Sequence, residues 1–202
     1  AGAGGRRLAR AVRRLAAPLL VAAALRLLAI AVSDREVADV ARYHKVAGHV
    51  LDVSWNPYQA PRLYPYPPVW VWVEAGAGWI ARHAPVSFPW LMKLPTLAPD
   101  LPIVALLLPR TRKGAWFYAL HPVAILVGAF HGQFDATALA LVLAALFALE
   151  RGQDDRSALL LAAAIGLKSF PVLLLPYFLL QRPARGARLR LAALALGPVG
   201  LL

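Results

Sequence analysis

The stretch His131-Gly132-Gln133-Phe134-Asp135, the HGQFD segment, places polar side chains in the middle of an apolar run from Ala115 to Leu149. At about 1.5 Å per residue, one helix over that run would be roughly 50 Å long, whereas a bilayer's hydrocarbon core is only about 30 Å thick. We therefore predict two short membrane spans that meet at the HGQFD segment. Each half of about 15 residues reaches only about 23 Å, so the turn should lie below the membrane surface, in a cavity lined by protein or water.

Polar side chains at membrane depth are unfavourable in lipid and make a functional site the first hypothesis. His131, Gln133 and Asp135 are therefore candidate binding residues. A structural alternative stays open, because His131 and Asp135 stand four residues apart and could pair with each other across one helical turn.

The composition is that of a membrane protein. Hydrophobic residues make up 60% of the 202-residue chain and the mean hydropathy is +0.59, which an ordinary soluble domain does not reach. The absence of cysteine leaves no disulfides and no thiolate metal sites. The net charge of +12 could indicate nucleic-acid binding, but the arginines cluster in short segments between apolar runs. We interpret them as topology signals and expect no nucleic-acid partner.

The first segments predict the orientation of the chain. Five arginines within residues 1–14 form a basic cytoplasmic head, and the apolar residues 15–32 are long enough for a first span that runs outward. Arg26 stands towards the outer end of that span, where its side chain could reach the interface or face a polar cavity, and we expect the former. Residues 33–68 should then form an extracytoplasmic loop.

Two kinds of segment make up this loop. Apolar residues recur at helical spacing between residues 33 and 52, which predicts an amphipathic helix on the membrane face and leaves Asp39, Tyr43 and His44 among polar neighbours. The stretch that follows is rich in proline and aromatic residues and predicts a stiff, extended loop. Its rings either anchor helix ends at the interface or form a platform for sugars, and both interpretations stay open. The tyrosines in question are Tyr58, Tyr64 and Tyr66.

Residues 69–202 complete a single transmembrane domain. An odd number of crossings must bring the chain back to the basic residues at 110–113, so we predict a re-entrant or interfacial helix at 69–80 and the second span at 91–108. Lys93 and Asp100, within this span, should each be satisfied by another helix.

A further apolar run at residues 157–180 is interrupted by Lys168-Ser169-Phe170-Pro171. A lysine at the centre of a helix in lipid costs about 3 kcal/mol, and the proline ends or kinks the helix. We therefore predict a second pair of short helices with Lys168 at their outer turn, although snorkelling to the outer interface is an alternative for this residue. This arrangement puts the basic clusters on the cytoplasmic side and Asp39, the HGQFD segment and Lys168 on the other.

The predicted fold class is therefore all-α: a polytopic transmembrane helical bundle with an extracytoplasmic loop that carries an amphipathic interfacial helix. No cluster of residues demands a metal, and we expect no cofactor. The chain starts without methionine and ends inside an apolar run, which suggests the N-terminal part of a longer membrane protein.

Several motifs, in order, resemble those of the GT-C superfamily of polytopic glycosyltransferases. They are an acidic residue shortly before a tyrosine (Asp39, Tyr43), then WNPY, LYPYPP, MKLPTLAPDL, LHPVAILVGAFHGQFDA and GLKSFPVLLLP, between about Asp34 and Tyr177. The chain is more narrowly similar to bacterial multi-span mannosyltransferases that use polyprenyl-phosphate sugars, and to the first mannosyltransferase of GPI-anchor assembly. HGQFD followed by KSFP is fairly specific. Asp39-Val40-Ala41 differs from the GPI enzyme's two acidic residues separated by one, and HGQFD differs from its corresponding turn, so sugar and acceptor stay open.

The resemblance implies transfer of a sugar, with mannose as first candidate, from polyprenyl phosphate to an extracytoplasmic lipid-linked or glycan acceptor, with inversion, at the bacterial inner membrane. The leaving phosphate is already a stable anion, so one base and one cation suffice, unlike the two carboxylates of glycoside hydrolases. Asp39 is the implied base, with Asp34 as fallback, and Lys168 the implied cation beside the phosphate. The other implied substrate contacts are Tyr43, His44, Tyr58, Tyr64, Tyr66, His131, Gln133 and Asp135.

Two other classes of function stay open. A transporter or lipid flippase also uses charged residues at membrane depth and broken helices, although the pattern of residues 91–180 has no second copy in the chain. A non-catalytic subunit of GT-C type would share the same motifs.

Overall fold

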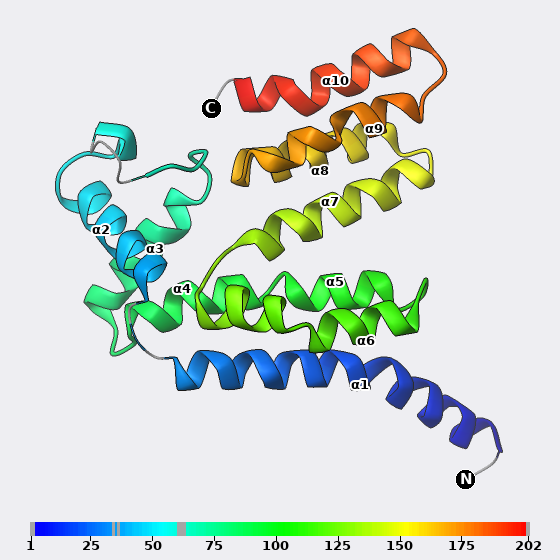
Figure 1. Cartoon of the computed structure of the whole chain (residues 1–202), viewed down its shortest axis with the longest axis horizontal. Coiled ribbons are helices and arrows are strands. Elements are labelled where there is room, and N and C mark those ends of the chain that lie inside the picture. The colour runs from blue at the N-terminus through cyan, green and yellow to red at the C-terminus, as the bar shows by residue number, and fades with distance from the viewer. Residues whose placement is uncertain (1–2, 34, 36, 60–63, 201–202) are drawn as a thin grey trace.

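The computed structural model describes residues 3–33, 35, 37–59 and 64–200, with side chains from residue 16 onward. Within these residues the chain is helical and has no strand, which confirms the all-α class. Most helices run side by side, and α2 and α3 lie together beyond one end of them (Figure 1). The elements are α1 (Ala3–Val32), α2 (Ala38–Asp52), the 3₁₀ turn η1 (Pro57–Gln59), α3 (Val71–His83), α4 (Phe88–Leu97), α5 (Asp100–Leu107), α6 (Arg112–Leu120), the π-helix η2 (Ala124–Phe130), α7 (Asp135–Glu150), α8 (Asp154–Leu167), the 3₁₀ turn η3 (Phe170–Leu174), α9 (Leu175–Leu180) and α10 (Arg185–Gly200).

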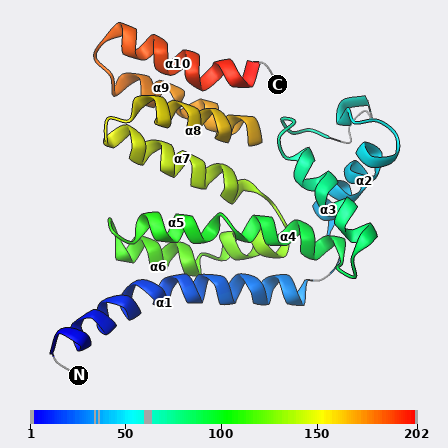
Figure 2. The same ribbon diagram turned by 180° about the vertical axis from the view of Figure 1, so that it is seen from behind.

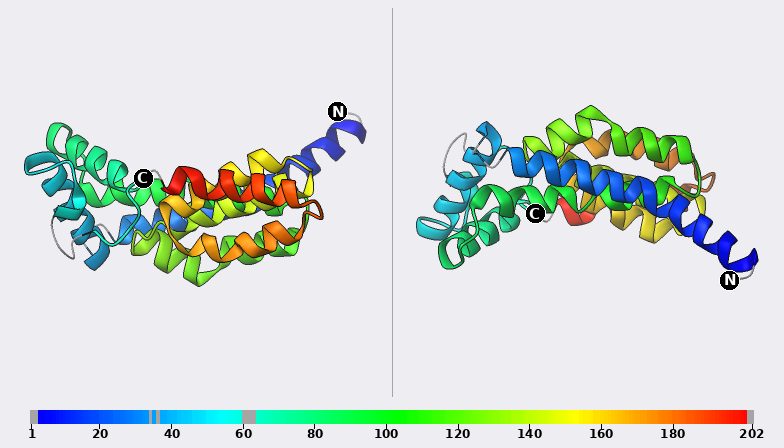
Figure 3. Two further views of the ribbon diagram at one scale, coloured as in Figure 1. Left: turned by 90° about the horizontal axis from the view of Figure 1, so that it is seen from above. Right: turned by 90° about the horizontal axis from the view of Figure 1, so that it is seen from below.

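The connections between the helices gather at two opposite ends. The N-terminus and the α5–α6, α7–α8 and α9–α10 connections lie at one end, whereas α2, α3, the start of α7 and the end of α8 lie towards the other (Figures 1 and 2). The views from above and from below in Figure 3 show the same separation along the long axis. The segments at the first end carry the basic residues that the sequence assigns to the cytoplasmic side, so these residues lie at the opposite end of the molecule from α2 and α3.

Few of the described helices are long enough to cross a bilayer alone. The continuous stretch Phe88–Leu107, made of α4 and α5, is long and apolar enough, and α6 with η2 would form a second such stretch, bent by 53°. Ala16–Val32 and Phe170–Leu180 are apolar but shorter. The polytopic bundle therefore stays a prediction.

Both interruptions predicted in the apolar runs are present. The HGQFD segment separates η2 from α7, and α8 ends at Leu167 immediately before Lys168. A further break was not predicted: α6 ends at Leu120, because His121 is extended (φ −66°, ψ 121°) and Pro122 has no amide hydrogen to continue the helix. The first half of the run from Ala115 is thus formed by two elements, α6 and η2, that are bent relative to each other.

The amphipathic helix predicted in the first loop is α2, and the segment predicted to be re-entrant or interfacial is α3. Together with the described residues of the aromatic loop between them they form a unit that we call the cap (residues 38–59 and 64–83). The two helices approach closely at Gly78, where an added Cβ would lie 2.8 Å from the Ala47 Cβ. A cluster of buried residues joins the cap to α4, the HGQFD segment and the end of α8: Val40, Tyr43, Ala47, Trp70, Ala77, Phe88, Met92, Phe134 and Leu167.

Three charged residues within the helices, Arg26, Lys93 and Asp100, are buried and hydrogen-bonded. Arg26 was expected at the interface, and that prediction is wrong: its side chain is fully buried and its Nε donates to Asp100 Oδ2 at 2.7 Å. A buried carboxylate stabilises the guanidinium where water cannot reach it. Lys93 donates to Ser33 Oγ at 2.9 Å. Asp100 is thus satisfied by another helix, as predicted, and Lys93 by Ser33, which directly follows α1.

Candidate active site

The backbone of the HGQFD segment brings the cap close to the helices. Gly132 has φ +77°, the left-handed region that favours glycine, and a Cβ there would lie 3.0 Å from Val40 Cγ2 and 3.3 Å from Lys93 Cγ. The segment follows a π-helix, an uncommon element that often occurs at functional sites. A glycine at this position therefore lets α2 pack directly on the turn.

Three segments that are far apart in sequence form one chain of hydrogen bonds. Gln133 Nε2 donates to Asp39 Oδ2 at 2.6 Å, and Lys168 Nζ donates to Gln133 Oε1 at 3.3 Å. Lys168 Nζ also pairs with Asp135 Oδ1 at 2.6 Å. Asp39 of the cap, the HGQFD segment and the turn after α8 thus lie in direct contact. We call Asp39, Gln133, Lys168 and Asp135 the polar network.

The partners of Gln133 determine which way its amide faces. A lysine ammonium can only donate and a carboxylate can only accept, so the amide oxygen faces Lys168 and the amide nitrogen faces Asp39. Tyr43 Oη supports this orientation by donating to the same oxygen at 3.5 Å. Burial raises the pKa of the Tyr43 hydroxyl well above its usual value, which keeps it protonated as a donor. Gln133 therefore links the carboxylate of Asp39 to the cation of Lys168.

Aromatic rings cover one side of the polar network. The Lys168 ammonium lies 4.5 Å from the centre of the Phe134 ring and 5.2 Å from that of Tyr66, distances at which a ring face attracts a cation. Trp70 stacks on Phe134 at 4.2 Å, and Tyr66 meets it edge-on at 5.0 Å. The Lys168 side chain is only 13% exposed, so its charge acts in a partly dehydrated site.

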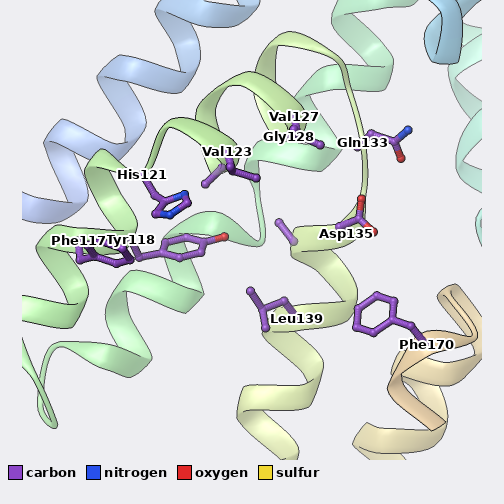
Figure 4. Close-up of a pocket in the computed structure, with 12 residues that line it drawn as sticks. Phe117, Tyr118, His121, Val123, Val127, Gly128, Gln133, Asp135, Leu139 and Phe170 are labelled. Carbon is purple, nitrogen blue, oxygen red and sulfur yellow. The ribbon is translucent and has the colours of Figure 1, made fainter. Parts of the chain in front are cut away.

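An apolar cavity of about 350 Å³ opens beside the polar network. Gln133 and Asp135 lie on one side of it, and Phe117, Tyr118 and His121 lie on the other (Figure 4). Its walls come from the bent α6–η2 piece, the start of α7 and the turn after Lys168. The full lining is Phe117, Tyr118, His121, Val123, Ala124, Val127, Gly128, Gln133, Asp135, Ala136, Leu139 and Phe170.

Some of the predicted site residues lie away from the polar network. His131 is exposed and does not pair with Asp135, whose partner is Lys168, so the alternative of a His131–Asp135 pair is not what the structure shows. The His44 ring stacks on Phe88 at 4.3 Å. Asp34, the fallback base, lies outside the described residues.

The tyrosines of the aromatic loop differ in position. Tyr66 lies over Lys168, as described above, whereas Tyr58 and Tyr64 mainly hold the loop together. Tyr58 Oη donates to the Tyr66 carbonyl at 2.7 Å, and Tyr64 Oη donates to that of Pro67 at 2.9 Å. Tyr43 was expected among polar neighbours but is buried, because Phe134 and Tyr66 pack against its ring.

Four residues of the site were missed from the sequence. Phe134 is fully buried beneath Lys168, and its position between Gln133 and Asp135 was a usable signal. Trp70 follows the proline-rich loop, and nothing in the sequence connects it with Phe134. Tyr118 and His121 line the cavity because the helix breaks at Pro122, and the His-Pro pair in an apolar run was the available signal. Within the described residues, no group of three or more histidines and acidic residues gathers in a way that could hold a metal ion.

The profile of glycosyltransferase family 87 matches residues 64–201, which is more than half of the chain. The chain therefore belongs to this family of membrane glycosyltransferases and is a GT-C-type glycosyltransferase. No curated protein and no solved structure matches it. The matched residues include the HGQFD segment and Lys168, whereas Asp39 precedes them.

Proposed function

We propose that this glycosyltransferase transfers a hexose, with mannose as the first candidate, from a polyprenyl-phosphate donor to an extracytoplasmic lipid-linked or glycan acceptor. The observation that carries the proposal is the polar network beside the apolar cavity. It joins a carboxylate, an amide and a cation at the edge of a space that suits a lipid. A donor with a charged phosphate and an apolar chain needs this combination.

Lys168 is the proposed partner of the donor phosphate. An ammonium has three hydrogen atoms to donate, and the described contacts use two of them, on Asp135 and Gln133. The third is available to a phosphate oxygen. The charge on that oxygen grows as the sugar leaves, so the contact strengthens towards the transition state and accelerates the reaction.

Asp39 is the proposed base. In the displacement, Asp39 takes the proton of the acceptor hydroxyl while the acceptor oxygen bonds to C1 of the sugar. The bond from C1 to the phosphate oxygen breaks on the opposite face and its electron pair leaves with the polyprenyl phosphate, which inverts the configuration at C1. Gln133 would hold Asp39 in position, since its Nε2 occupies one carboxylate oxygen and leaves the other for the proton.

The apolar cavity is the proposed site for the part of the lipid chain nearest the phosphate. Its lining is almost wholly hydrocarbon and aromatic, and its polar residues Gln133 and Asp135 are members of the polar network. The aromatic loop of the cap, above Lys168, would then hold the sugar, because aromatic faces and phenolic hydroxyls suit carbohydrate.

The proposed location is the bacterial inner membrane, with the cap and the polar network on the extracytoplasmic side. The separation of the basic connections from the cap supports this orientation, because positively charged segments stay in the cytoplasm.

The test is transfer of radiolabel from polyprenyl-phosphate mannose to lipid or glycan in membranes that contain the full-length protein. Matched membranes with the Lys168→Met variant serve as the control for background transferases. We expect transfer that depends on the wild-type protein. Transfer only from nucleotide sugars would contradict the proposed donor, and movement of a labelled lipid between leaflets without transfer would favour a flippase.

A further inference from the structure

The wall of the apolar cavity contains a break in a helix that lies within an apolar stretch. The Tyr118 carbonyl would normally accept from the amide four residues later, but that residue is Pro122, which has no amide hydrogen. His121 N donates to it at 3.2 Å, and the chain then continues as η2 at 53° to α6. Helix breaks at membrane depth require other donors for the carbonyl groups that they free.

Arg26 of α1 supplies those donors. Its Nη1 donates to the Ala119 carbonyl at 2.7 Å and to the Ala22 carbonyl at 3.4 Å, and its Nη2 donates to the Tyr118 carbonyl at 3.2 Å. Its Nε donates to Asp100 Oδ2 at 2.7 Å. The guanidinium thus connects α1 and α5 with the broken end of α6.

Tyr118 links this buried group to the cavity. Its hydroxyl donates to Asp100 Oδ1, the carboxylate oxygen that Arg26 Nε does not contact, and its ring lines the cavity (Figure 4). Arg26 and Asp100 are both fully buried and are not among the residues that line the cavity. Tyr118 therefore both contacts this buried ion pair and lines the cavity.

Stability alone is a weak reason for this arrangement. Replacing a buried ion pair with packed apolar residues is often neutral or stabilising. The distinct contribution of the pair is therefore the fixed geometry of its hydrogen bonds rather than a gain in the free energy of folding. A guanidinium with fixed donors and a carboxylate with two oxygens hold three helices and one tyrosine in a single geometry.

We propose that Arg26, Asp100 and Tyr118 form a positioning device that fixes the cavity wall, so that the lipid chain of the donor binds in line with its phosphate at Lys168. The device acts on recognition of the lipid and not on the chemical step, and it makes Tyr118 a residue that selects for the donor's chain. This inference rests on the proposed function, because it takes the cavity as the lipid site.

Tyr118→Phe is the main test, because it removes one hydroxyl and leaves the ion pair in place. We expect the KM for the polyprenyl-phosphate donor to rise about tenfold, which corresponds to about 1.4 kcal/mol, with kcat within about twofold and the acceptor KM unchanged. A donor whose prenyl chain is too short to reach the break should show no such rise. The matched control is Tyr177→Phe, an exposed tyrosine of α9 outside this group, which should leave all constants unchanged.

A double-mutant cycle tests whether the residues act through one another. Asp100→Asn alone should also raise the donor KM, and Tyr118→Phe with Asp100→Asn should be no worse than the more damaging single change, because both remove the same link. If the full ion pair is essential for insertion, the Tyr118→Phe measurement still decides the question.

Four results have distinct meanings. An unchanged donor KM in Tyr118→Phe overturns the inference while the proposed function stands. Lower yield of protein with unchanged kinetics also overturns it, since that pattern indicates a purely structural role. An equal rise in KM for long- and short-chain donors contradicts the selective role. A wild-type protein that transfers nothing removes the proposed function, and this inference with it.

Discussion

Glu74 provides a measurable consequence of the cap's packing. Its side chain in α3 is fully buried, and neither carboxyl oxygen has a hydrogen-bond partner within the described part of the chain. Burial raises the pKa of this carboxyl to about 9, so Glu74 is protonated in the folded protein at neutral pH. In the unfolded chain its pKa returns to the ordinary glutamate value of 4.5.

The sign and size of the effect follow from proton linkage. Between the unfolded and the folded pKa, the folded state holds a proton that the unfolded state has released, so the free energy of unfolding falls by about 1.4 kcal/mol per pH unit. The contribution is fully present below pH 4.5 and is lost progressively as the pH rises to about 9. From pH 6 to pH 8 the loss is about 2.7 kcal/mol, or roughly 5–10 °C in the unfolding midpoint of a chain of this size.

The assay compares thermal unfolding of the wild type and Glu74→Gln in detergent at pH 6 and pH 8. The amide has the shape of the protonated acid but does not titrate, so we expect the midpoint of the variant to lose most of this pH dependence and to exceed that of the wild type at pH 8. Glu150→Gln makes the same change at an exposed position and should retain the wild-type slope. Parallel slopes in wild type and Glu74→Gln would refute the assignment of a buried neutral acid.

Three further predictions concern the site and its orientation. Lys168→Met should lower turnover more than donor affinity, because the contact with the phosphate strengthens in the transition state, and Lys168→Arg should keep part of the activity. Steady-state kinetics and donor binding check both variants. Altered membrane insertion with normal kinetics would remove Lys168 from the site. A single cysteine at Gln133 should react with an impermeant maleimide in intact cells while one at Arg112 should not, and the reverse labelling would overturn the orientation. Gly132→Ala should destabilise the fold by about 1–2 kcal/mol from its positive φ alone, measured by thermal unfolding, and an unchanged midpoint would argue against the left-handed conformation of this residue.

The sequence predicted those features that follow from local chemistry. Apolar runs too long for one span, interrupted by HGQFD and by Lys168 with Pro171, indicated where helices end. The arginine clusters indicated which connections share an end of the molecule. Together they placed Asp39, Gln133 and Lys168 on one side before any contact was known, and the structure shows Gln133 hydrogen-bonded to both of the others.

The features that the sequence did not predict depend on contacts between distant segments. Arg26 was expected to reach the interface, since its observed partner, Asp100, is 74 residues away in the sequence. Tyr43 stands among polar residues in the sequence, but the Phe134 ring buries it. The break at Pro122 was present in the sequence as a His-Pro pair, but its consequence, a cavity beside Gln133, required the bent arrangement of α6 and η2.

The role of Asp39 is tested most directly by Asp39→Asn in the full-length protein, with donor binding and turnover both measured. The amide oxygen can still accept the hydrogen bond from Gln133, so the geometry is kept while the capacity to take a proton is lost. We predict a fall in turnover of about 10²–10⁴-fold with donor affinity nearly unchanged. Near-normal turnover in Asp39→Asn, together with loss of turnover in Asp34→Asn, would show that the base is the other carboxylate and contradict the account.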